Sequence, residues 1–269
     1  MWGTNPVPSP FFSIIVSTHE RAPLLERAIL SLTRQQFDDC EILVISDEGS
    51  RDTFDAAQRN LRKQDTFIRR SGLPGPAKSR NIGLQLAQGK FCLFLDDDDA
   101  HTPNCLVDAF DIIEKAKGEV FYFDYELIVE LRSTSPPVTI ERTVKKTDMD
   151  DIDNLMCYNF IPNSALAIST DVAKNQMFDE LLRSHEDWDF LLGILRSGHK
   201  FTHVPLVGVS VYHDRENRGH LNETARASGE WAPDFLYIYR RWPAITNEQR
   251  KLRHTMLKRL GHDIPLAWL

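Results

Sequence analysis

The stretch KFCLFLDDDDAHTPN, residues 90–104, joins a short apolar run to four consecutive aspartates. The apolar run has the length and composition of a buried strand. It ends abruptly in Asp96, Asp97, Asp98 and Asp99, whose carboxylates repel one another. Because folding does not require such a run, the sequence raises the question of which ligand balances its charge.

Short apolar runs alternate with helical patterns on the N-terminal side of the aspartates. Strands are predicted at 11–17, 41–46, 66–70 and 90–95, and helices after Pro23, from about Thr53 to Lys63 and within 76–88. This alternation predicts an α/β fold with a mainly parallel central sheet and helices on both faces. Ligands of such sheets bind beyond the carboxyl ends of the strands, so Asp47 and Glu48 are expected to face the same crevice as the aspartates.

The pattern changes after Pro103. The aromatic run EVFYFDYELIVEL (119–131) alternates in the manner of an antiparallel or edge strand. Further strands are predicted at 163–169 and 199–213, with a helix at 186–198 between them. Residues 145–163 are polar, and we expect them to form a mobile or substrate-facing segment.

The overall composition excludes several classes of protein. A net charge of −7 argues against a nucleic-acid binder, and it means that an anionic ligand would need a cation to help hold it. The four cysteines form no C-x-x-C pair, so we expect reduced, packed thiols. The sequence shows no apolar run of about 18 residues and no signal-peptide pattern, which predicts a cytoplasmic location.

The aspartate run has two interpretations. Carboxylate oxygens are hard ligands that suit Mn²⁺ or Mg²⁺, and the D-x-D spacing of Asp96 and Asp98 can place two of them around one ion. The alternative is a solvated acidic turn whose carboxylates cap the helix near Pro103. The position at the mouth of a parallel sheet favours the metal.

Three separated motifs resemble the family 2 glycosyltransferases of the GT-A fold. They are SIIVSTHERAPLLERAILSLTRQQFDDCEILVISDEGSRDT, GPAKSRNIGLQLAQGKFCLFLDDDD and HEDWDFLLGILRSGHKF, and the similarity covers about residues 11–215. The resemblance implies transfer of a sugar from a nucleoside diphosphate donor to an acceptor hydroxyl. It also implies inversion at the sugar and assistance by Mn²⁺ or Mg²⁺.

The resemblance assigns the metal and phosphate side of the donor site. Asp98 matches the metal ligand, and Asp96 matches the carboxylate that contacts the ribose or the water shell of the metal. Asp97 fills a variable position within the same nucleotide-sugar site and receives no central role. His213 lies where many members carry a histidine that completes the metal shell or contacts the diphosphate, although a histidine at a strand end is often neither.

The resemblance also assigns the nucleotide pocket. Asp47 lies in Ser46-Asp47-Glu48-Gly49-Ser50, a departure from the usual VDDGS that leaves the nucleotide open between UDP, which we favour, and GDP or dTDP. Thr18 and Glu20 match the cluster that lines the base pocket, although Glu20 could equally be an exposed loop acid. Arg80 matches an arginine that offers its guanidinium to phosphate or base, with an ordinary helix-surface arginine as the alternative.

The acceptor side is implied by SHEDWDF. Asp187 matches the catalytic base that removes the proton of the acceptor hydroxyl, and Glu186 matches its acidic neighbour. The alternative is that both acids only complement the dipole at a helix N-terminus. Trp188 is expected to pack in the core.

The chain is predicted to contain a catalytic domain at 1–215 and a helical extension at 216–269. Residues 11–103 would form the donor half and 104–215 the acceptor half. In the extension, Thr246 and Gln249 have the spacing of a capping box before a basic amphipathic helix. This helix either packs on the domain or makes peripheral contact with the inner face of the plasma membrane, beside a lipid-linked acceptor.

The predicted role is bacterial surface-glycan synthesis on a glycan or lipid-linked acceptor. Two other functions were weighed. A sugar-1-phosphate nucleotidyltransferase would carry a glycine-rich loop after the first strand, and STHERAP contains no glycine. A non-catalytic nucleotide-sugar-binding module would not need both the D-x-D and the Glu-Asp pair.

Overall fold

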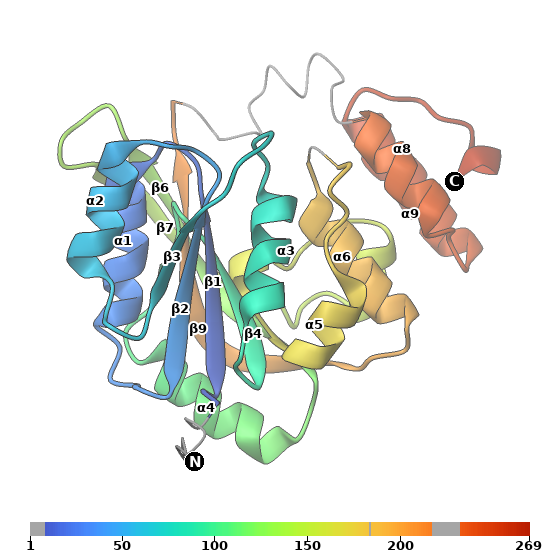
Figure 1. The fold of residues 1–269 in the computed structure, drawn as a ribbon. Coiled ribbons are helices and arrows are strands. Elements are labelled where there is room, and N and C mark those ends of the chain that lie inside the picture. The colour runs from blue at the N-terminus through green and yellow to red at the C-terminus, as the bar shows by residue number, and fades with distance from the viewer. Residues whose placement is uncertain (1–8, 183, 217–231) are drawn as a thin grey trace.

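A nine-stranded sheet organises the computed structural model, which describes residues 9–182, 184–216 and 232–269 (Figure 1). The strands are β1 (Phe12–Thr18), β2 (Cys40–Ser46), β3 (Thr66–Arg69), β4 (Phe91–Asp96), β5 (Ala100–His101), β6 (Val120–Leu131), β7 (Val138–Lys145), β8 (Leu166–Ser169) and β9 (Phe201–Asp214). Their order is β3-β2-β1-β4-β8-β6-β9-β5, and β7 pairs with β6.

Helices cover both faces of this sheet. The helices that cover the sheet are α1 (Ala22–Thr33), α2 (Arg51–Asn60), α3 (Pro76–Leu86), α4 (Cys105–Ala116), α5 (Thr170–Gln176) and α6 (Glu186–Arg196), and they are followed by α8 (Ala232–Arg241) and α9 (Asn247–Arg259). Three short 3₁₀ turns are η1 (Ile152–Met156), η2 (Asn163–Ala165) and η4 (Leu266–Trp268). The predicted mixed α/β architecture is therefore confirmed.

The first half of the sheet is parallel and buried on both sides. β1 pairs in parallel with β2 and β4, and its side chains alternate between two cores. Ile15 enters the core beneath α3, α5 and α6, whereas Ile14 and Val16 enter the core beneath α1, α2 and α4. This double burial explains why the strands read as continuous apolar runs.

Helix α3 packs unusually close to β1. A Cβ atom on Gly83 would lie only 2.4 Å from Ile15 Cγ2, so the helix can approach this closely because residue 83 is glycine. Pro76 begins the helix, where its missing N–H costs no hydrogen bond. This approach carries Arg80 to the carboxyl end of β4.

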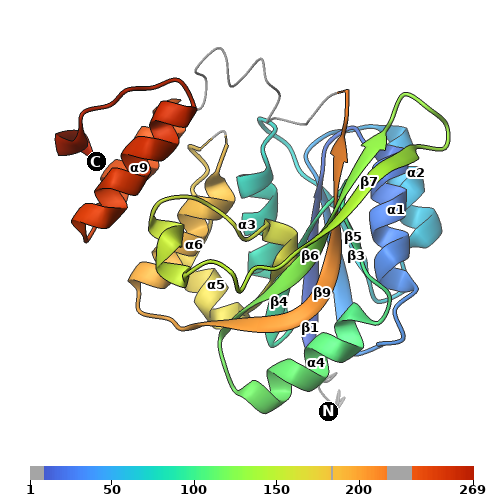
Figure 2. The same ribbon diagram turned by 180° about the vertical axis from the view of Figure 1, so that it is seen from behind.

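The second half of the sheet contains the long strands β6 and β9, which run side by side in Figure 2. β6 is antiparallel to β7 and β8, as the sequence predicts, but its parallel pairing with β9 places it inside the sheet and not at the edge. The polar segment after β7 also differs from expectation. Leu155, Met156 and Cys157 within it are buried in the core.

The last two helices pack beside α6 (Figures 1 and 2). Phe235 and Tyr239 of α8 and Leu257 of α9 share one core with Trp188, which is fully buried as predicted. The predicted capping box at Thr246 is confirmed, since its side chain accepts from the backbone of Gln249.

The sequence did not predict α8 as a separate helix. The predicted domain boundary at residue 215 lies next to residues 217–231, which are outside the described residues. All four cysteines are free and buried, as expected. None of the helices in the described part of the chain combines the length and apolar character that a membrane span needs.

Candidate active site

The carboxyl ends of β1, β2 and β4 meet at one edge of the sheet, as the parallel pairing requires. From β1, the buried Thr18 donates to Asp97 Oδ2 at 2.8 Å. Arg21, which follows β1, reaches Asp97 and Asp98 at 3.2 Å each. Glu20 between them is exposed and adopts φ 48°, in the left-handed region.

Asp47 forms the β2 side of this edge. One carboxylate oxygen lies 2.6 Å from His19 Nδ1, and the other accepts from Arg70 Nη2 at 3.2 Å and from the Gly75 amide at 2.8 Å. The Arg70 and Asp47 side chains are only 3% and 5% exposed, so this ion pair is buried at the carboxyl edge of the sheet. Such a pair is held firmly only when hydrogen bonds satisfy both partners, as they do here.

The four aspartates have divided roles. Asp97 and Asp99 are buried, and Asp99 accepts from Ser164 Oγ at 2.7 Å and from the Tyr212 amide at 3.1 Å. Burial raises the pKa of Asp97 to about 6 and raises the pKa of Asp99 well above its usual range. The side chains of Asp96 and Asp98 remain 37% and 24% exposed, so these two carboxylates are partly open to solvent.

Asp98 lies between two arginines. Arg21 and Arg132 each approach its Oδ2 at 3.2 Å, and Arg132 also donates to the Tyr212 carbonyl at 3.1 Å. The latter bond brings the end of β9, where His213 pairs in register with Val129, next to Asp98. This edge therefore brings carboxylates and guanidinium groups together, but the ligand atoms of Asp96, Asp98 and His213 do not all lie within 4.8 Å of one another.

These residues fit a divalent ion that is completed by a ligand. Mg²⁺ typically takes one or two protein carboxylates and fills its remaining positions with phosphate oxygens and water. Asp98 and Asp96 supply that number of partly exposed carboxylates, and Mn²⁺ accepts the same oxygen donors.

Within the described residues, one group of three side chains is already close enough to hold an ion, and it lies elsewhere. Asp124, Asp148 and His203 bring their ligand atoms within 4.8 Å of one another. Asp124 is already bonded to Lys146 Nζ at 2.7 Å and to the Thr147 amide at 2.9 Å. The sequence did not predict this group, and hydrogen bonds account for its geometry.

Arg80 joins the two halves of the site. Its guanidinium donates to Asp96 Oδ1 at 2.7 Å and to Glu186 Oε1 at 2.6 Å, and its side chain is only 5% exposed. Although burial opposes its charge, the two carboxylates raise the pKa of Arg80 above its usual range. In this structure Arg80 therefore bridges the end of β4 and the start of α6.

Asp187 occupies the first turn of α6 and is partly exposed. Its Oδ1 accepts from the Trp188 amide at 2.7 Å, and its Oδ2 accepts from Asn159 Nδ2 at 3.1 Å. Desolvation by the surrounding protein, followed by the charge of Glu186, raises the pKa of Asp187 to about 7. A carboxylate with this pKa can accept a proton near neutral pH.

Several residues at this edge were missed by the sequence analysis. Arg70 directly follows β3, and Arg132 directly follows β6. Because ligands bind beyond the carboxyl ends of strands, this position in the sequence could have identified both residues as candidates. Glu130, which pairs with Arg132 at 2.8 Å, lies within the last residues of β6 and lacks this signal. Asn159 has none, because its contact with Asp187 depends on the path of a segment without regular structure.

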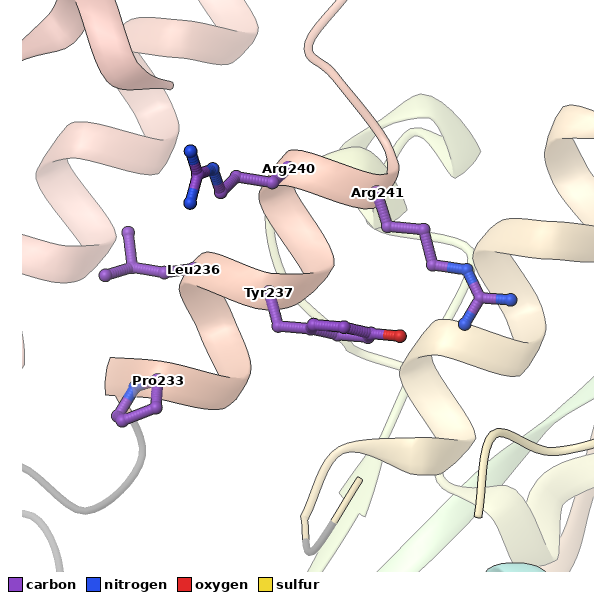
Figure 3. A pocket seen from close by; sticks show the side chains of 5 residues that line it. All are labelled: Pro233, Leu236, Tyr237, Arg240 and Arg241. Carbon is purple, nitrogen blue, oxygen red and sulfur yellow. The ribbon is translucent and has the colours of Figure 1, made fainter. Parts of the chain in front are cut away.

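An open hollow of about 530 Å³ lies away from these aspartates, along α8 (Figure 3). Its lining residues are Pro233, Leu236, Tyr237, Arg240 and Arg241. Tyr237 and Arg241 point toward α6 in Figure 3, and both bond to Asp179, at 2.8 and 2.6 Å. Pro233, Leu236 and Arg240 lie on the other side of α8 in Figure 3, so the hollow is an open surface along this helix.

Comparisons with known proteins agree with this geometry. The chain is 45% identical over 94 residues to GalNAc(5)-diNAcBac-PP-undecaprenol beta-1,3-glucosyltransferase of Campylobacter jejuni, a match that covers 34% of this chain and 30% of that enzyme. It is 26% identical over 228 residues to an uncharacterized glycosyltransferase of Rickettsia typhi, covering 83% and 71% of the two chains. The matched stretch is thus less than a third of the Campylobacter enzyme.

Solved structures and a family model extend the match. The crystal structure of Staphylococcus aureus TarS 1–349 with UDP-GlcNAc superposes with a TM-score of 0.66 at 18% identity, covering 92% of this chain and 72% of that one. The family model Glycosyl transferase family 2 matches residues 13–164, more than half of the chain. The chain therefore belongs to glycosyltransferase family 2 and is a glycosyltransferase of the GT-A fold.

Proposed function

We propose that this chain transfers a sugar from a nucleoside diphosphate to an acceptor hydroxyl with inversion at the anomeric carbon. The observation that carries the proposal is the pairing of two sites across Arg80. Asp96 and Asp98 offer partly exposed carboxylates on the β4 side, and Asp187 offers a carboxylate of pKa about 7 on the α6 side. The donor would therefore bind at Asp96 and Asp98, and the acceptor would bind at Asp187, with Arg80 between the two sites.

On the donor side, Asp47, Thr18 and Asp97 form the wall against which the nucleotide would lie, and Glu20 borders its opening. UDP is the favoured nucleotide, because TarS of the same fold is described in complexes with UDP and with UDP-GlcNAc. GDP is the alternative, since a Pyrobaculum calidifontis mannosyltransferase with a TM-score of 0.59 is described with GDP-Man and Mn²⁺. A dTDP donor would use the same wall.

Asp98, together with Asp96 and His213, would hold Mn²⁺ or Mg²⁺ against the diphosphate. When bound, the ion neutralises the negative charge that develops on the leaving nucleoside diphosphate. Arg21 and Arg132 already surround Asp98, and they are placed to contact phosphate oxygens as well.

On the acceptor side, Asp187 accepts the proton of the attacking hydroxyl. The hydroxyl oxygen forms its bond to the anomeric carbon while the bond from that carbon to the phosphate oxygen breaks and its electron pair leaves with the diphosphate. This single displacement inverts the configuration. Glu186 does not take the proton in this scheme, because its carboxylate is buried and bonded to Arg80.

The acceptor is proposed to be a bacterial surface glycan or its lipid-linked precursor. The Campylobacter relative is named for an undecaprenol-linked substrate, and TarS is named as a poly(ribitol-phosphate) beta-N-acetylglucosaminyltransferase. A cytoplasmic enzyme, peripheral at the inner face of the membrane, would meet such acceptors where nucleotide sugars are available.

The proposal is tested with Asp187→Asn. The variant should bind donor with unchanged affinity and lose transfer by about 10²–10⁴-fold, because it removes the base without touching the phosphates. Asp171→Asn, an exposed acid in the first turn of α5, is the matched control and should retain full activity. A panel of UDP-, GDP- and dTDP-sugars with Mn²⁺ identifies the donor. Transfer by Asp187→Asn at the wild-type rate would remove Asp187 from the mechanism.

A further inference from the structure

Three consecutive backbone carbonyls each accept a hydrogen bond from a different helix. Leu155 O accepts from Trp188 Nε1 of α6 at 2.6 Å. Met156 O accepts from Arg253 Nε of α9 at 2.8 Å, and Cys157 O accepts from Tyr239 Oη of α8 at 2.6 Å. The segment 155–157 is therefore fixed to α6 and to both helices of the extension at once.

Arg253 is the strongest of these attachments. It is completely buried, and its Nη2 also donates to the Trp242 carbonyl at 2.6 Å while the guanidinium lies 4.2 Å from the centre of the Tyr239 ring. Burying a guanidinium is costly unless its donors are satisfied, so this arrangement is stable only with the segment and the extension both in place. Arg253 therefore does not belong to the basic surface of the helix.

The same segment continues to Asn159, which contacts the proposed base Asp187. Asn159 Oδ1 accepts from the Ile161 amide at 3.1 Å, which fixes the orientation of the side chain and turns its NH₂ group toward Asp187 Oδ2, 3.1 Å away. The Trp188 amide holds the other oxygen of Asp187. Both carboxylate oxygens are thereby oriented.

We propose that Asn159 is the positioning residue for the base Asp187, and that α8 and α9 hold Asn159 in place through the carbonyls of residues 155–157. This inference rests on the proposed function of Asp187. It assigns the C-terminal extension a part in the reaction: the extension completes the acceptor half of the site without contacting the sugar.

The contact with Asn159 should act on the charge state of Asp187. A donor N–H stabilises the ionised carboxylate. The charged groups that face Asp187 are Glu186 on its own helix, Arg80 on α3 and Asp96 at the end of β4, and the nearby Tyr158 is bonded to Asp150. Glu186 and Asp96 oppose ionisation of Asp187, and Arg80 favours it together with Asn159.

The first test is the pH profile of transfer by Asn159→Ala. We expect the acid limb of kcat/KM for the acceptor to move upward by roughly one pH unit, with donor affinity unchanged. Asn159→Gln, which retains the amide, should recover part of the shift. A wild-type profile in Asn159→Ala would overturn the inference.

The second test changes residues of α8 and α9 and measures the effect on Asp187. Tyr239→Phe removes only the bond to Cys157 O, and we expect it to move the acid limb in the same direction by a smaller amount. Arg253→Met should do so more strongly, and the exposed Arg250→Met on the same helix is the control. If Tyr239→Phe and a folded Arg253→Met both keep the wild-type profile, α8 and α9 do not hold Asn159.

The roles of Asp187 as base and of Asn159 as its positioning residue can be disproved separately. Activity of Asp187→Asn at the wild-type rate removes the proposed base and the inference with it. Loss of activity in Asp187→Asn together with an unshifted Asn159→Ala profile leaves the base in place and removes only the positioning role.

Discussion

At the scale of single residues, the aspartate run shows how neighbouring identical side chains acquire different tasks. A strand directs successive side chains to opposite faces, and the turn after β4 continues this separation. Asp97 and Asp99 point into protein and accept hydrogen bonds, whereas Asp96 and Asp98 keep exposed surface. Hydrogen-bond donors hold Asp97 and Asp99, and arginines pair with Asp96 and Asp98, whose carboxylates also stay partly open to solvent.

Asp98→Ala should separate metal binding from folding. We expect the variant to stay folded, because Asp98 is partly exposed and its arginines can be solvated, but to lose the Mn²⁺-dependent part of donor binding. Calorimetry of the nucleoside diphosphate with and without Mn²⁺ measures this directly, and chelator should abolish transfer by the wild-type enzyme. Full activity in excess chelator would contradict an ion at this position.

At the scale of elements, ion pairs connect β4, α3 and α6, and we call this connection the joint. Arg80 lies on α3 between the carboxylates of Asp96 and Glu186, and the close approach of α3 to β1 at Gly83 determines how far it reaches. Removing one member of a buried ion pair leaves the partner charged and desolvated, which costs more than the pair contributes. The joint is therefore sensitive to a change in any one member.

Arg80→Met should lower the free energy of unfolding by about 3–5 kcal/mol, because two carboxylates lose their shared cation. Glu186→Gln in the same background should restore part of the loss, with a coupling energy of about 1–3 kcal/mol. Arg51→Met breaks the exposed pair with Asp55 and should cost under about 1 kcal/mol. Urea unfolding measures all three, and equal losses for Arg80→Met and Arg51→Met would refute the buried joint.

The elements that were predicted correctly are those with local causes. β1, β2 and β4 follow from short apolar, β-branched runs, and the start of α9 follows from the Thr246 and Gln249 spacing. The contacts that build the acceptor side join residues far apart, such as Arg80 with Glu186 and Arg253 with Met156. No local pattern encodes them, so the sequence predicted Asp187 but not the asparagine that orients it.

At the scale of the whole molecule, charge and packing are divided between the two faces of α9. Leu257 enters the core, and Leu252 and Leu260 pack against it. The apolar side of this amphipathic helix therefore faces the core that contains α6. Arg250, Lys251, Lys258 and Arg259 are exposed. The apolar side of α9 is therefore already packed against protein. A membrane could contact only the exposed basic side.

Binding to anionic vesicles decides whether that basic face meets a membrane. If it does, co-sedimentation should rise with anionic lipid, fall in salt, and weaken in a triple variant with Lys251, Lys258 and Arg259 changed to glutamine, since each basic residue contributes about 1 kcal/mol. These substitutions are preferable to deleting 246–269, which would remove Leu257 and Arg253 from the core.

The matched control for the vesicle experiment neutralises three exposed basic residues elsewhere, by Arg51→Gln, Lys63→Gln and Lys115→Gln. These residues lie on or beside α2 and α4, away from α9 (Figure 1). Equal sedimentation of wild type and both triple variants with neutral and anionic vesicles would leave α9 with the packing role only.

The position of Trp188 gives the protein a built-in optical reporter. Its indole follows the proposed base directly, is fully buried, and lies edge-on to Phe235 and Tyr239 of α8, at centroid distances of 5.2 and 5.6 Å. Loss of contact with α8 would place the ring in a more polar medium and shift its fluorescence to longer wavelength. Replacing the exposed Trp268 by phenylalanine would reduce the solvent-exposed background. The emission of Arg253→Met in this background would then report whether α8 stays packed against Trp188, without any added label.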